Sequence, residues 1–339
     1  MDEANGHDGA VRRRLLKGIA GGLGAGILSP LGTLAQEFPI RPIRIVVPYA
    51  AGGAPELFVR PMGNVLAPRL GQQLVVEYRP GANSQIGAAH VAKSPADGYT
   101  LLFISDAAMS IAPALVPNLP FNPQEDFVAV TILTHLPFLL VANPKAGFGN
   151  VREMLARAKA APGTVSYGSL GIGSSAHVAV EVLAQQSGVE LLHVPYQGTG
   201  PAVTAVVGGE VNSVFASMGP SLPHIRAGRL VPVAISSRTR SPVLPEVPTF
   251  IESGIADFDV RGWFGIVAPR ATPEAALRLL RREMWAFVTS KEVTEDIVLK
   301  NGYEPTSVAP EDTERFLREN RVQWSTWVKR VESRIRKSS

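Results

Sequence analysis

The chain has 339 residues, of which 45% are hydrophobic and 18% charged, enough for a large buried core and two domains of ordinary size. The formal net charge is only +4 and no Lys/Arg-rich block follows residue 17, so the composition does not indicate a nucleic-acid partner. There is no cysteine, which excludes disulfides, thiolate metal sites, a lipoprotein anchor and a cysteine nucleophile.

The first 35 residues carry the three parts of an export signal. A polar leader precedes the basic run Arg12-Arg13-Arg14-Leu15-Leu16-Lys17, an uncharged glycine-rich stretch follows, and small residues mark a cleavage site at Ala35. The arginine pair, two leucines and a lysine are typical of a twin-arginine signal. We therefore predict a twin-arginine-type signal peptide over 1–35, cleaved near Ala35, and a periplasmic mature protein. A membrane anchor of minimal length and export by the general secretory route remain alternatives.

Strand-like and helix-like runs alternate through the rest of the chain. Short apolar runs predict strands at 43–47, 74–77, 99–104, 139–141, 165–167, 191–194 and 230–235. Helical patterns fall at 55–70, 85–93, 176–186, 273–288 and 311–335, the last with apolar residues at helical spacing that we assign to packing. This alternation predicts parallel sheets with helices on both faces, whose ligands bind beyond the carboxyl ends of the strands.

Three loops that follow predicted strands have the composition of a binding site. The first is Val47 to Gly53, the second Ser105 to Ala107, and the third Gly168 to Ser175, which leads into a helix. Glycines let backbone N–H groups approach a ligand, and a helix N-terminus favours an anion. One Gly-Ser loop is equally well a tight turn, but three after successive strands indicate a site. His177, one position into the helix, is either a cap or core residue or a ligand contact.

The familiar catalytic and metal-binding patterns are absent from the sequence. There is no GxSxG, SxxK, HExxH or Walker-type loop, and no pair of histidines at metal-ligand spacing. The stretch Gly171 to Ala176 does match G-x-G-x-x-A, a weak dinucleotide signal, but the acid that should end the next strand is missing. We therefore predict no catalytic residue, no metal and no cofactor. The alternative is an exported cofactor-binding oxidoreductase that uses the Gly171–Gly173 loop.

A series of short motifs runs through nearly the whole mature chain. They are Arg41-Pro42-Ile43, Val46-Val47-Pro48-Tyr49, Gly52-Gly53, Arg79-Pro80-Gly81-Ala82, Ile86-Gly87-Ala88, Asp97-Gly98-Tyr99-Thr100-Leu101-Leu102, Tyr167-Gly168-Ser169, Gly171-Ile172-Gly173-Ser174, His193-Val194-Pro195-Tyr196, Pro201-Ala202, Gly208-Gly209, Pro248-Thr249 and Trp263-Phe264-Gly265. In this order and at these spacings, the set resembles the Bug-type extracytoplasmic solute receptors of tripartite tricarboxylate transporters.

The resemblance implies an α/β, type II periplasmic-binding-protein fold: two lobes with mixed sheets joined by two crossing strands. Lobe one would be 37–139 plus 264–339 and lobe two 140–263, with crossings near Leu139 to Ala142 and near Trp263 to Ala268. The implied function is not enzymatic. It is the capture of a small carboxylate, a dicarboxylate or aromatic acid, for the membrane permease subunits of such a transporter. We expect a monomer, and a receptor reused in signalling would share the same ligand predictions.

The resemblance also places a ligand on this chain, with one end on the first loop and a carboxylate on the third. The predicted ligand-binding residues are Tyr49, Ala51, Gly52, Gly53, Ser105, Asp106, Ser169, Gly173, Ser174, Ser175, His177, Ala216 and Ser217.

Four departures from the family pattern bear on the ligand. Glu56 stands where the family usually has Asp, Tyr78 where Asn is common, Asn83-Ser84-Gln85 where Gly-Gly-Asn is usual, and Ala216 where an acidic residue is often seen. Removing an acid from the cleft disfavours a ligand with a free amino group and suits a plain carboxylate.

Overall fold

The computed structural model describes residues 38–337 except Gly52 and Asn83. Internal contacts divide the chain into Met1–Glu37 and Phe38–Ser339, and the second unit contains all of the described residues. The predicted signal peptide and its cleavage near Ala35 lie outside the described residues and stay predictions. None of the described helices is both long enough and apolar enough to cross a membrane.

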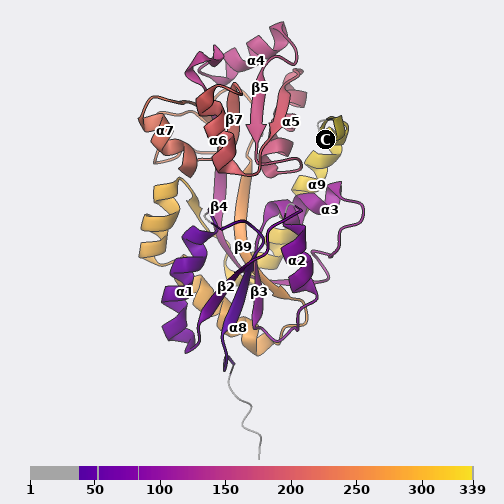
Figure 1. Cartoon of the computed structure of the whole chain (residues 1–339), viewed down its shortest axis with the longest axis vertical. Helices are drawn as coiled ribbons and strands as arrows, with labels where there is room; N and C mark the ends of the chain where they lie inside the picture. Colours follow the sequence, from indigo (N-terminus) through magenta and orange to yellow (C-terminus); the bar gives the residue numbers. More distant parts are fainter. Residues whose placement is uncertain (1–37, 52, 83, 338–339) are drawn as a thin grey trace, which may run out of the picture. The chain divides into compact units, whose positions relative to one another are not determined.

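The strands of the described residues pair into one ten-stranded sheet with the order β2-β1-β3-β9-β4-β7-β5-β6, and β8 and β10 also pair with β4. Figure 1 labels β2, β3, β9, β4, β7 and β5 of this sheet. Their bounds are β1 Ile43–Val47, β2 Leu74–Tyr78, β3 Thr100–Ser105, β4 Phe127–Ala142, β5 Ser166–Ser169, β6 Leu192–Pro195, β7 Ser213–Ser217, β8 Val231–Ile235, β9 Arg261–Pro269 and β10 Glu304–Pro305.

The pairing is parallel on both flanks and antiparallel in the middle. β1 runs parallel to β2 and β3, and β5 runs parallel to β6 and β7, as the alternating pattern predicts. Between these groups, β9 is antiparallel to β3 and β4, and β4 is antiparallel to β7 and β8. The alternation predicts the parallel groups but not the antiparallel strands between them, and the mixed sheets implied by the resemblance are observed.

β4 connects the two parallel groups. Up to Pro137 it pairs with β9, and from Phe138 onwards it pairs with β7 (Figure 1). Nearly all of its sixteen residues are buried, as expected for a strand covered on both faces. The lobe boundaries 37–139, 140–263 and 264–339 stay a prediction.

Helices of very different lengths cover the sheet: α1 Glu56–Leu70, α2 Gln85–Ala92, α3 Ala112–Leu115, α4 Val151–Ala160, α5 Ser175–Ser187, α6 Thr199–Gly208, α7 Leu222–Arg226, α8 Glu274–Val288 and α9 Thr313–Lys337. Two π-helical turns, η1 Ala107–Ile111 and η4 Val293–Val298, and four 3-10 turns, Pro144–Ala146, Gly219–Ser221, Leu299–Asn301 and Pro310–Asp312, complete the described structure.

The long C-terminal helix α9 packs against both parallel groups. Its Leu317 lies in the apolar cluster that contains Trp263 of β9, whereas Trp324 and Val331 lie in the cluster built around α5. Each fully buried side chain of this kind contributes about 1.5–3 kcal/mol. The predicted packing role of the α9 aromatic and aliphatic residues is thus confirmed, and α9 supports α5, the helix that follows the third loop.

Candidate ligand-binding site

The three predicted loops meet through direct side-chain hydrogen bonds. Tyr49 Oη donates to Ser105 Oγ over 2.7 Å, and Ser175 Oγ donates to Asp106 Oδ2 over 2.6 Å. Because Ser105 ends β3 and Asp106 follows it, the two bonds join the loops after β1, β3 and β5 in a chain. We call Tyr49, Ser105, Asp106 and Ser175 the carboxyl-edge cluster. That it binds a ligand stays a prediction.

The loop before α5 is held in a conformation that requires glycine. Gly171 has φ +117° and Gly173 has φ +74°, and a Cβ on Gly173 would lie 3.1 Å from the Leu115 side chain. Ser174 is the N-cap of α5, since its Oγ accepts the His177 N–H over 3.3 Å. The Ser174 hydroxyl therefore stabilises the helix in this structure.

Two backbone donors at the start of α5 have no acceptor within the helix. Ser175 and Ala176 occupy its first two positions, where an N–H has no carbonyl four residues back. The next N–H, of His177, is taken by the cap, and the Gly173 N–H is donated to His177 Nδ1 over 3.1 Å. The donors that could hold an anion are thus those of Ser175 and Ala176, beside the Asp106 carboxyl.

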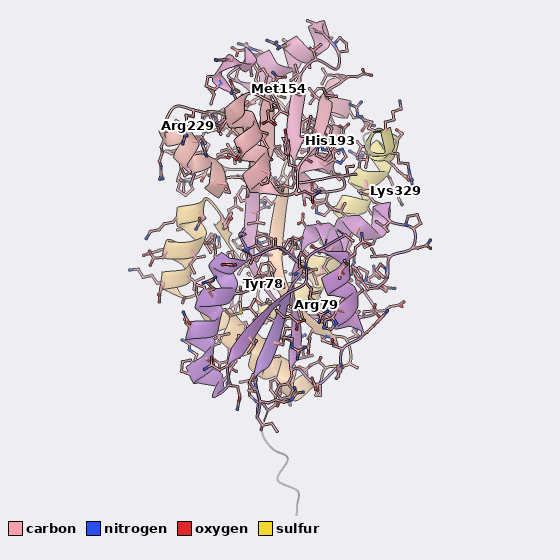
Figure 2. The ribbon with its side chains drawn as sticks, in the orientation of Figure 1. Tyr78, Arg79, Met154, His193, Arg229 and Lys329 are labelled. Carbon is pink, nitrogen blue, oxygen red and sulfur yellow. The ribbon has the colours of Figure 1, made fainter. Side chains whose placement is uncertain are left out.

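A pair of stacked histidines contacts the loop before α5. The rings of His177 and His193 lie 3.8 Å apart at 9°, and Ser169 Oγ is 2.7 Å from His193 Nε2. Figure 2 labels His193. Burial lowers the pKa of His177 to about 4, and burial together with the neighbouring His177 lowers the pKa of His193 to about 3. Both rings are neutral at pH 7, and His177, which accepts at Nδ1, carries its proton on Nε2. The structure therefore places His177 and Ser169 in the support of the loop.

Asp106 is the only ionisable member of the cluster with a pKa raised into the neutral range. Its side chain belongs to a residue only 3% exposed, and burial raises its pKa to about 7 against the opposing effect of the Ser175 hydrogen bond and of the backbone N–H groups of Ala107 and Trp263. A Cβ on Gly262 of β9 would lie 3.4 Å and 3.5 Å from its two carboxyl oxygens. The absence of a side chain at Gly262 lets the backbone of β9 approach Asp106 closely.

Ala216 and Ser217 lie at the end of β7 and belong to a different contact. Ser217 Oγ is 3.5 Å from Thr199 Oγ1, and it also bonds the Tyr303 phenol, whose pKa burial raises to about 12. Ala216, a residue of β7, is 1% exposed and lies in the apolar cluster that contains residues of α6. No hydrogen bond seen among the described residues connects either of them to the carboxyl-edge cluster.

The remaining candidates lie on the first loop. Ala51 and Gly53 are exposed, and Gly53 O accepts the Glu56 N–H over 3.1 Å at the start of α1. Gly52 lies outside the described residues. Within the described structure, neither Ala51 nor Gly53 makes a hydrogen bond to the second or third loop.

The departures at Glu56 and Tyr78 contact each other. Tyr78 Oη donates to Glu56 Oε1 over 3.0 Å, and Arg60 Nε donates to Glu56 Oε2 over 2.9 Å (Tyr78 is labelled in Figure 2). Both oxygens of this carboxylate have partners on the protein, so Glu56 serves as a first-turn acid of α1.

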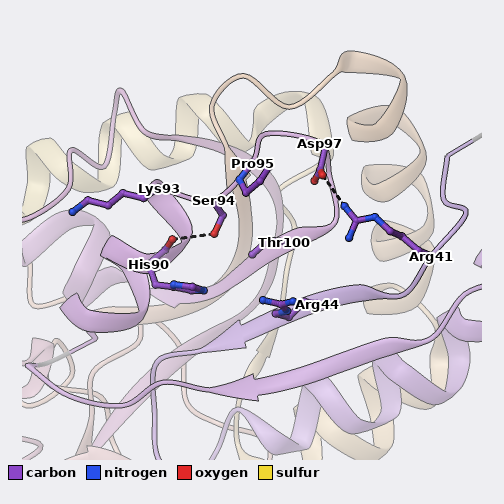
Figure 3. Close-up of a pocket in the computed structure, with 8 residues that line it drawn as sticks. All are labelled: Arg41, Arg44, His90, Lys93, Ser94, Pro95, Asp97 and Thr100. Atoms are coloured by element: carbon purple, nitrogen blue, oxygen red, sulfur yellow. Dashed lines mark hydrogen bonds and ion pairs between the residues drawn. The ribbon is translucent and has the colours of Figure 1, made fainter.

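A polar pocket lies at the opposite edge of the sheet, at the amino ends of β1 and β3. It has a volume of about 400 Å³ and is lined by residues at the start of β1 and β3 and around the end of α2: Arg41, Arg44, His90, Lys93, Ser94, Pro95, Asp97 and Thr100 (Figure 3). We call it the amino-edge pocket. Arg41 pairs with Asp97 over 2.7 Å and Arg44 pairs with Glu77 over 3.3 Å, so its arginines are neutralised by the protein.

Sequence reasoning missed His193, Gly262 and Tyr303 as neighbours of the candidate residues. A signal for His193 was present in the sequence, because it begins the motif His193-Val194-Pro195-Tyr196, and in the structure it lies on β6 opposite Tyr167 of β5. Gly262 and Tyr303 come from segments far along the chain, and no local signal marks their contacts with Asp106 and Ser217. Among the described residues, no group of three His, Asp or Glu side chains could hold a metal ion.

The fold and sequence match known proteins over most of the chain. The model of the tripartite tricarboxylate transporter receptor family matches residues 58–332. Protein BugT of Bordetella pertussis (strain Tohama I) is 35% identical over 313 residues, which are 92% of this chain and 95% of that protein.

Two solved structures with ligands are also similar. Rpa4515 of R. palustris with adipate matches with a TM-score of 0.80 and 29% identity, over 86% of this chain and 97% of that one. MatC (Rpa3494) from Rhodopseudomonas palustris with bound malate matches with a TM-score of 0.77 and 29% identity, over 86% and 100%.

The α/β fold and the convergent loops define a solute-binding receptor of the periplasmic-binding-protein type. The chain belongs to the tripartite tricarboxylate transporter receptor family. This is a family of receptors and not of enzymes, which decides against the alternative of an oxidoreductase that uses the Gly171–Gly173 loop.

Proposed function

We propose that this receptor captures a small carboxylate, with a dicarboxylate favoured over an aromatic acid, and hands it to the membrane permease subunits of a tripartite transporter. The ligand binds between the first loop and the start of α5, against Tyr49, Gly53, Ser105, Asp106 and Ser175, with Ser169 and His177 supporting the loop and Ser217 at the far end of the site. The receptor acts as a monomer in the periplasm, to which the segment 1–35 directs it before cleavage near Ala35.

The observation that carries the proposal is the pair of backbone donors at the start of α5. The N–H groups of Ser175 and Ala176 point out of the positive end of a 13-residue helix, at the place where the three loops meet. A carboxylate placed there needs no arginine, because the helix dipole and the two donors supply the positive charge.

The size of this interaction favours a second carboxylate. Two hydrogen bonds to a charged acceptor and the dipole together contribute roughly 3–7 kcal/mol. Micromolar binding needs about 8 kcal/mol after ordering costs. A second anionic group, held by the first loop around Tyr49 and Gly53, makes up the difference. The relatives solved with adipate and with malate support this choice.

The acidic side chains near the site do not favour an amino ligand. Glu56 is bonded to Tyr78 and Arg60, and burial brings the pKa of Asp106 to about 7, so that it carries only part of a charge at neutral pH. The position of Ala216 offers no acid. A free ammonium group therefore lacks a dedicated partner.

The test is a thermal-shift screen followed by calorimetry with adipate, malate, succinate, benzoate and a set of amino acids. A dicarboxylate is expected to raise Tm in proportion to the logarithm of its concentration. Tight binding of an amino acid without any response to the dicarboxylates and benzoate contradicts the proposal.

Substitution of the helix start gives a second test. Ser174→Ala with Ser175→Ala removes the cap and the hydroxyl next to Asp106, and affinity should fall at least tenfold in a folded protein. Ser187→Ala at the other end of α5 is the matched control and should bind as the unaltered chain does. Equal affinity of all three proteins removes Ser174 and Ser175 from the site.

A further inference from the structure

The carboxyl group of Asp106 lies where its charge would oppose that of the ligand. Ser175, the first residue of α5, donates its hydroxyl to Asp106 Oδ2 over 2.6 Å, and the neighbouring Ser175 N–H is one of the two donors proposed for the ligand. Asp106 is only 3% exposed, so water screens little of its charge. A ligand carboxylate at this helix end therefore lies next to the carboxyl group of Asp106.

Among the described residues, no positively charged side chain sets the pKa of the Asp106 carboxyl, which depends on burial, on the Ser175 hydroxyl and on backbone N–H groups. On β9, Arg261 is held by Asp259 over 3.0 Å and by Glu304 over 3.2 Å. β4 carries His135 and the first turn of α5 carries His177, and burial lowers the pKa of each to about 4.

The remaining elements around Asp106 bring no charge to it either. On the first loop, the titratable group is the Tyr49 phenol, whose pKa burial raises further above its usual value. η1, which follows Asp106, contains no ionisable side chain, and α9 contributes the neutral Asn320 to Ser110 of η1. The next residue of α9, Arg321, interacts electrostatically with Glu314 and Arg318, and burial lowers its pKa. The helix dipole and the two N–H donors offset one carboxylate, so the remaining way to offset the second is a proton.

We propose that Asp106 is a specificity-determining residue that holds the ligand carboxylate through a shared proton. The inference rests on the proposed function. On binding, the Asp106 carboxylate takes up one proton from solvent, and the resulting hydroxyl donates a hydrogen bond to a ligand carboxylate oxygen. No covalent bond of the ligand changes, and the proton returns to solvent when the ligand leaves.

Proton sharing fixes the direction of the pH dependence. The free receptor has an Asp106 pKa of about 7, and the negative ligand raises that pKa further in the complex. A group whose pKa rises on binding gives the highest affinity below its free-state pKa. The affinity then falls as pH rises towards the bound-state pKa, by at most tenfold per pH unit. Between pH 6.5 and 8.5 both carboxyls of a dicarboxylate stay ionised, so the ligand itself adds no slope.

The experiment is calorimetry of the mature receptor with adipate and with malate from pH 6.5 to 8.5, in two buffers of different ionisation enthalpy. The receptor should lose about ten- to twentyfold in affinity over this range and take up about 0.6 to 0.8 of a proton near pH 8. Asp106→Asn imitates the neutral acid. Its affinity for both dicarboxylates should not change with pH, and at pH 8.5 it should bind them more tightly than the unaltered chain does.

A matched variant and the separate outcomes make the test decisive. Asp97→Asn, in the amino-edge pocket, should keep the slope of the unaltered receptor. Binding of either dicarboxylate with no proton uptake, or with an unchanged slope in Asp106→Asn, overturns this inference and leaves the proposed function intact. If no carboxylate binds, both the proton-sharing inference and the proposed function are overturned. If Asp106→Asn does not fold, the proton uptake of the unaltered receptor decides.

Discussion

Two polar clusters lie at opposite ends of the same strands and handle charge in different ways. In the amino-edge pocket, half-exposed arginines pair with acids, as Arg41 does with Asp97. In the carboxyl-edge cluster, hydroxyls and a single buried carboxyl bond one another without an arginine. Exposed pairs are solvated and individually contribute little, whereas each buried polar group must be satisfied by a specific partner. The protonation state of Asp106 and the geometry of the loops therefore determine the charge and hydrogen bonding of the carboxyl-edge cluster, whereas the amino-edge pocket depends on solvated ion pairs.

The largest expected effect tests the neutral histidines under the carboxyl edge. His177 has its pKa lowered to about 4 from 6.5, so its contribution to stability is present above pH 6.5 and is lost as pH falls towards 4. At pH 5 the loss is about 2 kcal/mol relative to pH 8. His177→Phe keeps a ring against His193 and should show a shallower fall in the free energy of unfolding over this range. Denaturant unfolding at pH 8, 6.5 and 5 measures it, and parallel curves for the two proteins contradict the assignment of a buried neutral ring.

The second prediction compares two glycines at the two ends of α5. Gly173 and Gly188 both have positive φ, at +74° and +63°, but a Cβ would meet Leu115 at Gly173 and open space at Gly188. Each substitution by alanine should cost about 1–2 kcal/mol of stability through backbone strain. Only Gly173→Ala displaces the loop before α5, so only it should lower dicarboxylate affinity, by roughly tenfold. Calorimetry on both variants decides, and a similar loss in Gly188→Ala shows that general destabilisation is the cause.

Local patterns reveal the strand ends but not what packs across them. Ser105 and Ser175 were predictable because each lies at the end of a recognisable strand or at the start of a helix. The full length of β4 was not, since Thr134, His135 and Pro137 interrupt its apolar run. In the structure, the buried Thr134 hydroxyl donates a hydrogen bond to Glu304 O over 2.8 Å, and the two residues are 170 positions apart in the sequence.

The same limit applies to the titration of the site. The raised pKa of Asp106 depends on burial beneath the backbone of β9, and sequence spacing alone does not bring Gly262 to this carboxyl. The resemblance supplied the fold and the positions of the loops, whereas the charge state of the site required the structure. The fold follows from periodicity and motif order, and the electrostatics follow from long-range packing.

The smallest expected effect lies in the amino-edge pocket. Arg41→Gln removes the exposed ion pair with Asp97 and the stacking of its guanidinium, 3.9 Å from the centre of the Tyr99 ring. Because this guanidinium is solvated, the substitution should cost about 0.5–1 kcal/mol at low salt and less at 0.5 M salt, where the charges are screened. Urea unfolding at the two salt concentrations measures the difference, and dicarboxylate affinity should stay the same. A loss of affinity in Arg41→Gln would show that the two edges are coupled through β1 and do not handle charge independently.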